Sequence, residues 1–449
     1  MAGKAGCGAG VTILAAGLLF AFASCASTPD SQAKVDAGVQ AGLFEEALTR
    51  VDYERGRRGR GRVAVWNHPR NDILFYLDRG MIRHFAGLYE DSFHDLHTAE
   101  RLIEEAFTRS LTQDISALML NDTVRDYQGE AYEDLYINVF NALNLYFMGS
   151  LEGALVEIRR LNEKLNLLAD RYERVARRML DANQQLDSAG LPIEASRFSN
   201  SALARYLGIL FYRAAGNPDG VRIEHEELVR AFGLAPDIYT HPIPSSVYDE
   251  ISIPAGKARL NVIAFTGLSP IKVEEHIWLP LPFPPPNHSV RIALPVMLRR
   301  PQAINRVEAV VVETGERFTL ELLEDMGAVA KDTFRSTYSL TVIRSAARAI
   351  TRATAAAIGA QIAEETGGQG MGLAVGILGR VFAEAAERAD TRVSRYFPNH
   401  ALVGAVNLEP GSYTVTVFFY GSAGLVNTQS RPIEVREHTL NLKRFVWLE

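Results

Sequence analysis

The spacing of apolar residues changes near Pro236, and this change constrains the fold more than any other feature of the sequence. Before it, apolar residues recur every three or four positions, as in Val139 and Leu143, which is the spacing of one helix face. After it, short runs rich in β-branched and aromatic residues are bounded by Pro, Gly and Asn, which is typical of strands. The sequence therefore predicts an α+β protein with a helical domain at 41–236 and a β-rich domain at 237–449.

Three segments of the helical half share one pattern, in which a helix is followed by a glycine turn and a second helix. The turns lie at Gly87, Gly149 and Gly216. The pattern resembles tetratricopeptide repeats, although these turns lie 62 and 67 residues apart where that motif has about 34. The resemblance implies stacked hairpins that fold without the β-rich half and form a concave groove. The alternative is an irregular bundle whose hairpins are alike by chance.

The β-rich half contains six predicted strands and one helical insertion. The strands are expected at 260–265, 290–294, 307–312, 318–322, 413–420 and 433–442, and together they predict a β-sandwich. Residues 340–388, rich in Ala and Gly, predict a tightly packed helical hairpin inserted in this domain. Their uncharged runs are too short to span a bilayer, and a re-entrant membrane contact is the alternative interpretation.

The N-terminus has the layout of an export signal. Lys4 precedes thirteen uncharged, mostly apolar residues that end directly before Ser24-Cys25, fewer than the roughly 20 that a membrane span needs. The layout resembles the lipobox of bacterial lipoproteins, with Phe22 where that family has Leu. The resemblance implies that residues 1–24 are removed and that Cys25 is acylated. An ordinary signal with an incidental cysteine is the alternative.

After the cysteine, residues 25–40 are mostly small and polar, and a segment of this composition is expected to be a disordered tether. The cysteine count agrees with the lipid interpretation, because Cys7 and Cys25 are the only two and the first would leave with the signal. With 47 basic and 53 acidic side chains the chain carries a net charge of −6. This balance argues against general binding of nucleic acid, which needs a concentrated positive field.

Several short strings after residue 71 resemble an uncharacterised family of bacterial envelope lipoproteins. This family has Ser-Trp where the present chain has Val393-Ser394. The resemblance implies an envelope role beside lipoproteins that regulate cell-wall synthesis, and it assigns no activity. The strings are Asn121-Asp122, Tyr127-Gln128-Gly129-Glu130, Tyr132-Glu133, residues 138–144, 156–160 and 267–272, and Ala389-Asp390-Thr391-Arg392.

The candidate partner-binding residues follow from the expected groove. Its wall would be built from the first helices, so apolar and tyrosine side chains there are candidates to contact a partner segment. A stripe of amides on the same helix could bind a peptide, and an internal hydrogen-bonded network is the alternative. The candidates are Tyr136, Val139, Leu143 and Tyr146, together with Asn138 and Asn141.

Other motifs carry weaker functional signals. His94, His97 and Glu100 share a helix face that we expect to be solvated, and no cofactor or metal site is predicted. The arginine-rich residues 55–62 could touch lipid headgroups or remain a solvated loop. The proline-rich residues 278–286 predict a polyproline II segment, either a ligand for a partner or a rigid connection.

These features favour a lipid-anchored, non-enzymatic scaffold or adaptor of the cell envelope, expected at the outer membrane facing the periplasm. It would bind another envelope protein through the helical groove. The alternative is an envelope enzyme acting on wall or lipid material, with a carboxylate site at Glu130, Glu133 and Asp134 beside Tyr127. A deep pocket where titratable groups converge would favour the enzyme, and a long shallow groove would favour the adaptor.

Overall fold

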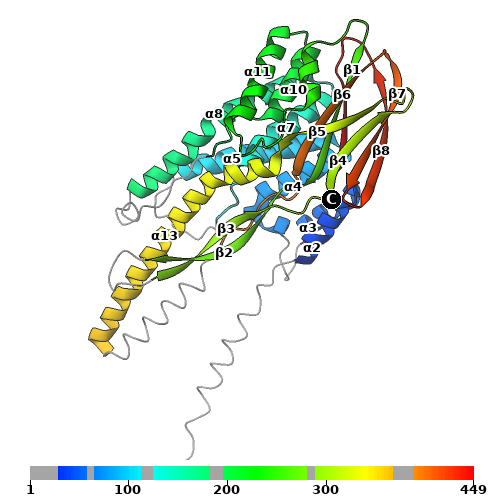
Figure 1. Ribbon diagram of the computed structural model, residues 1–449. Coiled ribbons are helices and arrows are strands. Elements are labelled where there is room, and N and C mark those ends of the chain that lie inside the picture. The colour runs from blue at the N-terminus through cyan, green and yellow to red at the C-terminus, as the bar shows by residue number, and fades with distance from the viewer. Residues whose placement is uncertain (1–28, 58–64, 113–124, 182–195, 281–288, 368–387) are drawn as a thin grey trace, which may run out of the picture.

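The computed structural model describes residues 29–57, 65–112, 125–181, 196–280, 289–367 and 388–449. Helical hairpins cover one side of a strongly curved sheet, and a long helix extends from the body together with a two-stranded ribbon (Figure 1). The expected α+β class is confirmed. The expected signal and Cys25 lie outside the described residues.

Helical hairpins make up the first half of the described chain. Each first helix ends at a glycine with positive φ, namely Gly42, Gly87, Gly149 or Gly216. The pairs are α2 (Pro29–Gln40) with α3 (Phe44–Gly56), α4 (Asp72–Ala86) with α5 (Tyr89–Thr112), α7 (Ala131–Phe147) with α8 (Leu151–Asp181), and α10 (Ala202–Ala214) with α11 (Pro218–Leu234).

The four glycine turns have the same hydrogen bonds. The residue after the glycine donates its N–H to the carbonyl five positions earlier, as Leu88 does to Arg83 at 3.0 Å. This is the Schellman ending of a helix, which needs a left-handed residue and so favours glycine. The three hairpin turns expected from the sequence are therefore confirmed, and the turn at Gly42 is an additional one.

Helix α2 corrects the expectation of a disordered tether at 25–40. Its apolar residues Val35 and Val39 are fully buried, and Gly38 lies close to Ala47 of α3. Asp36 pairs with Arg395, which lies far along the chain. The composition of this segment is too polar to order it alone, but contacts with the rest of the protein supply the missing stabilisation.

The strands of the main sheet lie in the order β8-β7-β4-β5-β6-β1-β9. Neighbours are antiparallel except β1 and β9, which pair in parallel. Gln429 of β8 donates to the Val446 carbonyl of β9 at 2.7 Å, so the two ends of the sheet nearly close. The strands are β1 (Ala258–Leu268), β4 (Ile304–Val311), β5 (Arg317–Asp325), β6 (Pro398–Leu408), β7 (Gly411–Gly421), β8 (Gly424–Val435) and β9 (Asn441–Trp447).

This sheet corrects the expected β-sandwich. Its interior is filled by side chains from its own strands, such as Val262, Val417 and Phe419, instead of by a second facing sheet. Alternating apolar residues predict a strand with one buried face, but they do not reveal whether that face meets another sheet or the far side of the same one.

The helices and the sheet share one continuous core. Strand β1 is buried along its whole length, because one face points into the curled sheet and the other packs on the helices. Phe140 of α7 lies between Phe265 of β1 and Phe397, at ring-centroid distances of 5.3 and 5.9 Å. The boundary at Pro236 therefore separates helices from strands, but it does not separate two cores.

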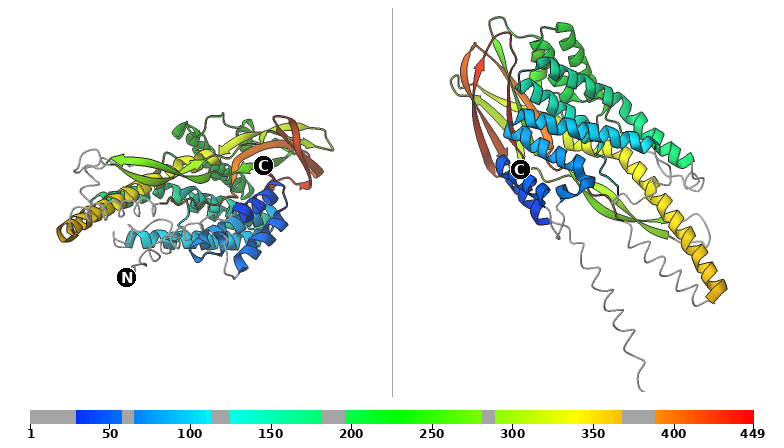
Figure 2. Two further views of the ribbon diagram at one scale, coloured as in Figure 1. Left: turned by 90° about the horizontal axis from the view of Figure 1, so that it is seen from below. Right: turned by 180° about the vertical axis from the view of Figure 1, so that it is seen from behind.

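A projecting arm leaves the body. It consists of β2 (Ile271–Pro280), β3 (Ser289–Leu298) and residues 338–367 of α13 (Met326–Gly367). These segments run outward together (Figure 1 and Figure 2). Ile292 and Leu294 of β3 pack on Val342 of α13. Residues 278–280 are part of strand β2 and not of a polyproline segment, and 281–286 lie outside the described residues.

Helix α13 corrects only the start of the hairpin expected at 340–388. It begins at Met326, directly after β5, and continues as one helix to Gly367. The second half of the expected hairpin lies outside the described residues. None of the helices in the described part combines the length and the apolar character that a membrane span requires. The short helices of the body are α12 (Ser245–Tyr248), η2 (Val65–Asn67), η3 (Pro69–Asn71) and η5 (Asp249–Ile251).

Candidate functional site

The residues proposed for a partner groove lie in the core. Tyr136, Val139 and Leu143 are at most 1% exposed, and the Tyr136 hydroxyl donates to Glu324 of β5 at 2.7 Å. Tyr146 is half-buried and donates to the Leu440 carbonyl at 2.7 Å. The wall of the first helices is thus covered by the protein's own sheet, and it is not a free groove for a partner. The periodicity identified an apolar face correctly but not what covers it.

The amide stripe forms part of an internal network, as the alternative interpretation held. Asn138 donates to Glu100 and Glu157 at 2.9 and 2.6 Å, and Asn144 bonds to His84 and Ser92. Asn141 is buried and has no hydrogen-bond partner among the described residues. Asn138 and Asn144 hold neighbouring hairpins together, and all three amides are buried, so none is available to bind a peptide.

Sequence strings that are far apart in the chain meet around a small cavity, which we call the Lys272 cavity. It has a volume of about 70 Å³ and lies between the start of α7, the ribbon β2–β3 and α13. Its lining combines residues before α7 with side chains of α13 and of the segment after it. The lining residues are Arg125, Asp126, Tyr127, Gln128, Gly129, Glu130, Lys272, Pro295, Phe334, Thr337, Thr341, Arg344 and Asp390.

Lys272 is the central charge of this cavity. Its ammonium group pairs with Glu130 at 2.6 Å, and both side chains are at most 5% exposed. Burial by itself would lower the pKa of Lys272, but the nearby carboxyl groups of Glu130 and Asp390 raise it above its ordinary value. Lys272 therefore stays protonated at neutral pH and has no lone pair with which to act as a nucleophile.

Glu133, the other carboxylate of the predicted acid–base site, points into the structure. It accepts hydrogen bonds from the Tyr127 hydroxyl at 2.6 Å, from the Glu130 N–H at 2.7 Å and from the Ser394 N–H at 2.5 Å. Burial and the neighbouring Glu130 raise the pKa of Glu133 to about 8, while these donors limit the shift. Asp134 also pairs away from the cavity, with Lys164 at 2.6 Å.

The segment that follows α13 is fixed by buried carboxylates. Asp78 of α4 accepts from the Ser394 hydroxyl and the Arg395 N–H at 2.8 and 3.0 Å, and burial raises its pKa to about 6. Asp390 is held by Arg392 through both carboxylate oxygens. Lys272 and Asp390 each lie within a short sequence string that by itself indicates no role, because only the fold brings the strings together.

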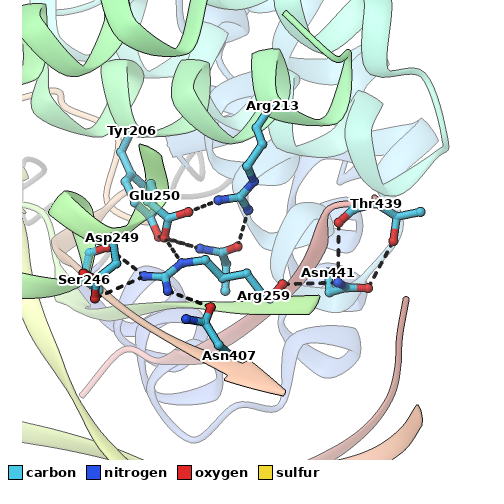
Figure 3. Close-up of polar contacts among 10 residues, drawn as sticks. Tyr206, Arg213, Ser246, Asp249, Glu250, Arg259, Asn407, Thr439 and Asn441 are labelled. Carbon is cyan, nitrogen blue, oxygen red and sulfur yellow. Dashed lines mark hydrogen bonds and ion pairs between the residues drawn. The ribbon is translucent and has the colours of Figure 1, made fainter. Parts of the chain in front are cut away.

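A second polar cluster joins α10 to the sheet (Figure 3). Glu250 pairs with Arg213 and Arg259 and accepts from the Asn261 amide at 2.6 Å. Arg259 also donates to Asn407 and to the Ser246 carbonyl. Its charged groups are matched by partners within the protein, so the cluster is a structural connection and not a binding site.

The arginine-rich residues and the helix face with Glu100 pair with other parts of the body where the structure describes them. Arg55 donates to the Trp66 carbonyl and to Asp72, while 58–62 lie outside the described residues. Glu100 is buried against Lys164 and Arg160 instead of lying on a solvated face. Within the described residues no group of side chains is placed to hold a metal ion.

Comparison of the chain with protein-family models, with curated proteins and with solved structures finds no match.

Proposed function

We propose that this chain is a lipid-anchored, non-enzymatic adaptor of the cell envelope that contacts its partner through the arm. One observation supports this choice: the helical wall is occupied by the protein's own sheet, whereas the arm leaves the body with Trp278 of β2 62% exposed. Tryptophan often contributes much of the energy at an interface. In the sheet register Trp278 lies opposite Arg291, which is also exposed and is of a residue type enriched in interfaces.

The relation of the helical half to tetratricopeptide repeats belongs to the same proposal. The four equivalent glycine turns support it, and the long spacing between turns is the departure from that motif. In this proposal the repeats act as a rigid platform for the sheet and the arm, and not as the surface that binds.

The enzyme remains a second candidate because Glu130, Lys272 and Asp390 converge on one cavity. Its volume of about 70 Å³ is small beside the roughly 300–1,000 Å³ of ordinary ligand pockets. Glu130 and Asp390 are also already paired with cations. These features favour the adaptor, because wall or lipid substrates would need more space and an unpaired acid or base.

Site-specific photo-crosslinking tests the arm in intact envelopes. A photoreactive amino acid at position 278 is expected to give a discrete, light-dependent product with another protein. The control is position 248, where Tyr248 is similarly exposed, at 54%, but lies on α12 of the body. The adaptor proposal fails if position 278 gives no product, or if both positions give the same set of products.

The lipid anchor is tested by Cys25→Ser, with Cys7→Ser as the matched control. Because the mature chain would have no other cysteine, we expect Cys25→Ser to move the protein from the membrane pellet to the soluble fraction after a high-salt wash. Cys7 lies in the segment that would be removed, so Cys7→Ser should leave the protein in the pellet. One acyl chain is marginal and two already anchor stably. Recovery of Cys25→Ser in the pellet at the wild-type level would contradict Cys25 as the anchor.

A further inference from the structure

The two strands of the arm ribbon differ in how far the rest of the protein covers them. In the register of the ribbon, residues 274–277 of β2 lie opposite residues 292–295 of β3. The four residues of β3 are buried, whereas 274–276 are exposed and Ile277 is half-buried. Strand β3 is also the strand that packs on α13. Strand β2 is therefore the outer strand of the ribbon.

The outer edge of β2 has no strand beside it among the described residues. In an antiparallel pair, every second residue directs its N–H and its carbonyl away from the neighbouring strand. None of these outward groups of β2 bonds to another backbone group in the described chain, over a strand of ten residues. Such an edge can pair with an extended segment of another chain, in which main-chain hydrogen bonds supply affinity and side chains supply specificity.

Two of the exposed side chains at this edge are carboxylates. Glu275 forms no ion pair with a described residue, and Glu274 is paired with His276 at 3.2 Å, which is a charge pair only when the imidazole is protonated. Lys272, the lysine of this strand, is already paired with Glu130 inside the body. The edge therefore carries negative charge that the protein does not neutralise, and a segment with basic side chains would be complementary to it.

The same carboxylates argue against a second copy of this chain as the occupant. If two β2 strands paired antiparallel about position 275, the two Glu275 side chains would lie opposite each other, and a shift of one residue would place Glu274 opposite Glu275. Like charges directly opposite each other destabilise a strand pair, and charged side chains on an edge are a common protection against self-pairing. A basic strand meets attraction at the positions where a second copy meets repulsion.

Trp278 adds an apolar requirement three residues further along the edge. Its side chain is 62% exposed, and a paired strand would cover part of it. Aromatic and β-branched residues stabilise each other across a strand pair, and a tryptophan covered in this way contributes strongly to an interface. The complementary segment therefore combines adjacent basic residues with a β-branched or other apolar residue beyond them.

We propose that the outer edge of β2 binds an extended, basic segment of a partner protein by main-chain pairing. Lysine or arginine side chains of that segment lie opposite Glu274 and Glu275, and an apolar side chain covers Trp278. This inference rests on the proposed contact between the arm and a partner, and it names the chemistry of the partner segment.

Peptide binding to the full-length protein tests the chemistry of the segment. The probe is the capped hexapeptide Thr-Val-Lys-Lys-Val-Thr, and the control has Glu-Glu in place of Lys-Lys. We expect fluorescence polarization to give a Kd about tenfold lower for the lysine peptide, because the control replaces both opposite-charge pairs by like-charge pairs. The absence of binding, equal binding of the two peptides or tighter binding of the glutamate peptide would overturn the proposal.

Hydrogen exchange identifies the edge that the lysine peptide uses. Pairing with the outer edge should slow the exchange of amide hydrogens within residues 271–280. Strand β8 is the control, because it also has a hydrogen-bonded strand on one side only, and its exchange should not change. Equal protection of the two strands, or none in β2, would contradict main-chain pairing at this edge.

Glu275→Lys is expected to abolish the preference for the lysine peptide, since one attractive and one repulsive pair would then remain with either peptide. The matched control is Glu434→Lys on β8, where the carboxylate is 61% exposed, and this variant should keep the preference. Unchanged thermal midpoints would show that both variants fold. Loss of the preference in both variants, or in neither, would contradict the assigned role of Glu275.

Photo-crosslinking from position 278 in intact envelopes separates this inference from the adaptor role. A product that is lost with Glu275→Lys and kept with Glu434→Lys would support pairing at the edge. A product that persists unchanged with Glu275→Lys would overturn edge pairing and leave the adaptor role standing, whereas no product from the unaltered edge would overturn both. A product made of two copies of this chain would overturn the choice of a different, basic partner.

Discussion

A fragment of residues 29–236 is expected to show no cooperative thermal transition, although the sequence predicted that the helical half folds alone. The α7 side chains that face the sheet, such as Phe140, Tyr136 and Leu143, would be exposed to water. Each such exposure costs about 1.5–3 kcal/mol. Several together equal the whole stability of a typical domain, about 5–15 kcal/mol.

Circular dichroism during heating provides the measurement, with the chain from residue 29 to residue 449 as the control. The control should melt in one sharp transition, because its helices and sheet share a core. The fragment should keep helical signal from its hairpins and lose it gradually on heating. A sharp transition of the fragment, near the midpoint of the control, would show that the helices form an independent domain.

Glu250→Ala is expected to reduce the free energy of unfolding by about 3–5 kcal/mol, the range for removing one partner from a buried ion pair. The Glu250 side chain is fully buried, and Figure 3 shows its carboxylate facing Arg213 and Arg259. Its loss would leave the guanidinium of Arg259, which is 2.9 Å from Glu250, with only the more distant Asp249 at 4.0 Å, and would also unpair Arg213. Arg259 is 2% exposed, so water cannot replace the carboxylate there, whereas Arg213 is 16% exposed and could be partly hydrated.

The matched control is Glu226→Ala, which also removes a carboxylate from an arginine. Glu226 pairs with Arg222 at 2.7 Å, but both side chains are about 60% exposed, so the change should cost less than about 1 kcal/mol. Urea unfolding of both variants and the wild type, with the slope of each transition compared, measures the difference. Similar losses for the two variants would mean that the buried cluster contributes no more than a surface pair.

Local features of the fold could be predicted from the sequence because their causes are local. The turns at Gly87, Gly149 and Gly216 need a residue that adopts positive φ, and a glycine after an apolar helical pattern indicates this directly. Short runs such as 260–265 and 413–420 were recognised as strands, and they lie within β1 and β7. Strand β6 and helix α2 were missed, because their stabilising contacts come from distant parts of the chain.

The candidate sites show the same division. The sequence identified the apolar face that contains Tyr136 and Leu143, but the tertiary structure decided that the protein's own sheet covers it. The strings that contain Glu130, Lys272 and Asp390 are each ordinary in isolation, and the structure brings them to one cavity.

Residue spacing thus determined which faces are apolar and where the chain turns, since both depend on neighbours within a few positions. The pairing of β1 with β9, the near closure of the sheet and the Lys272 cavity depend on contacts between residues far apart in sequence. Such contacts are decided by the packing of the whole chain, because any apolar face can be buried by several different partners, and only the complete fold selects one.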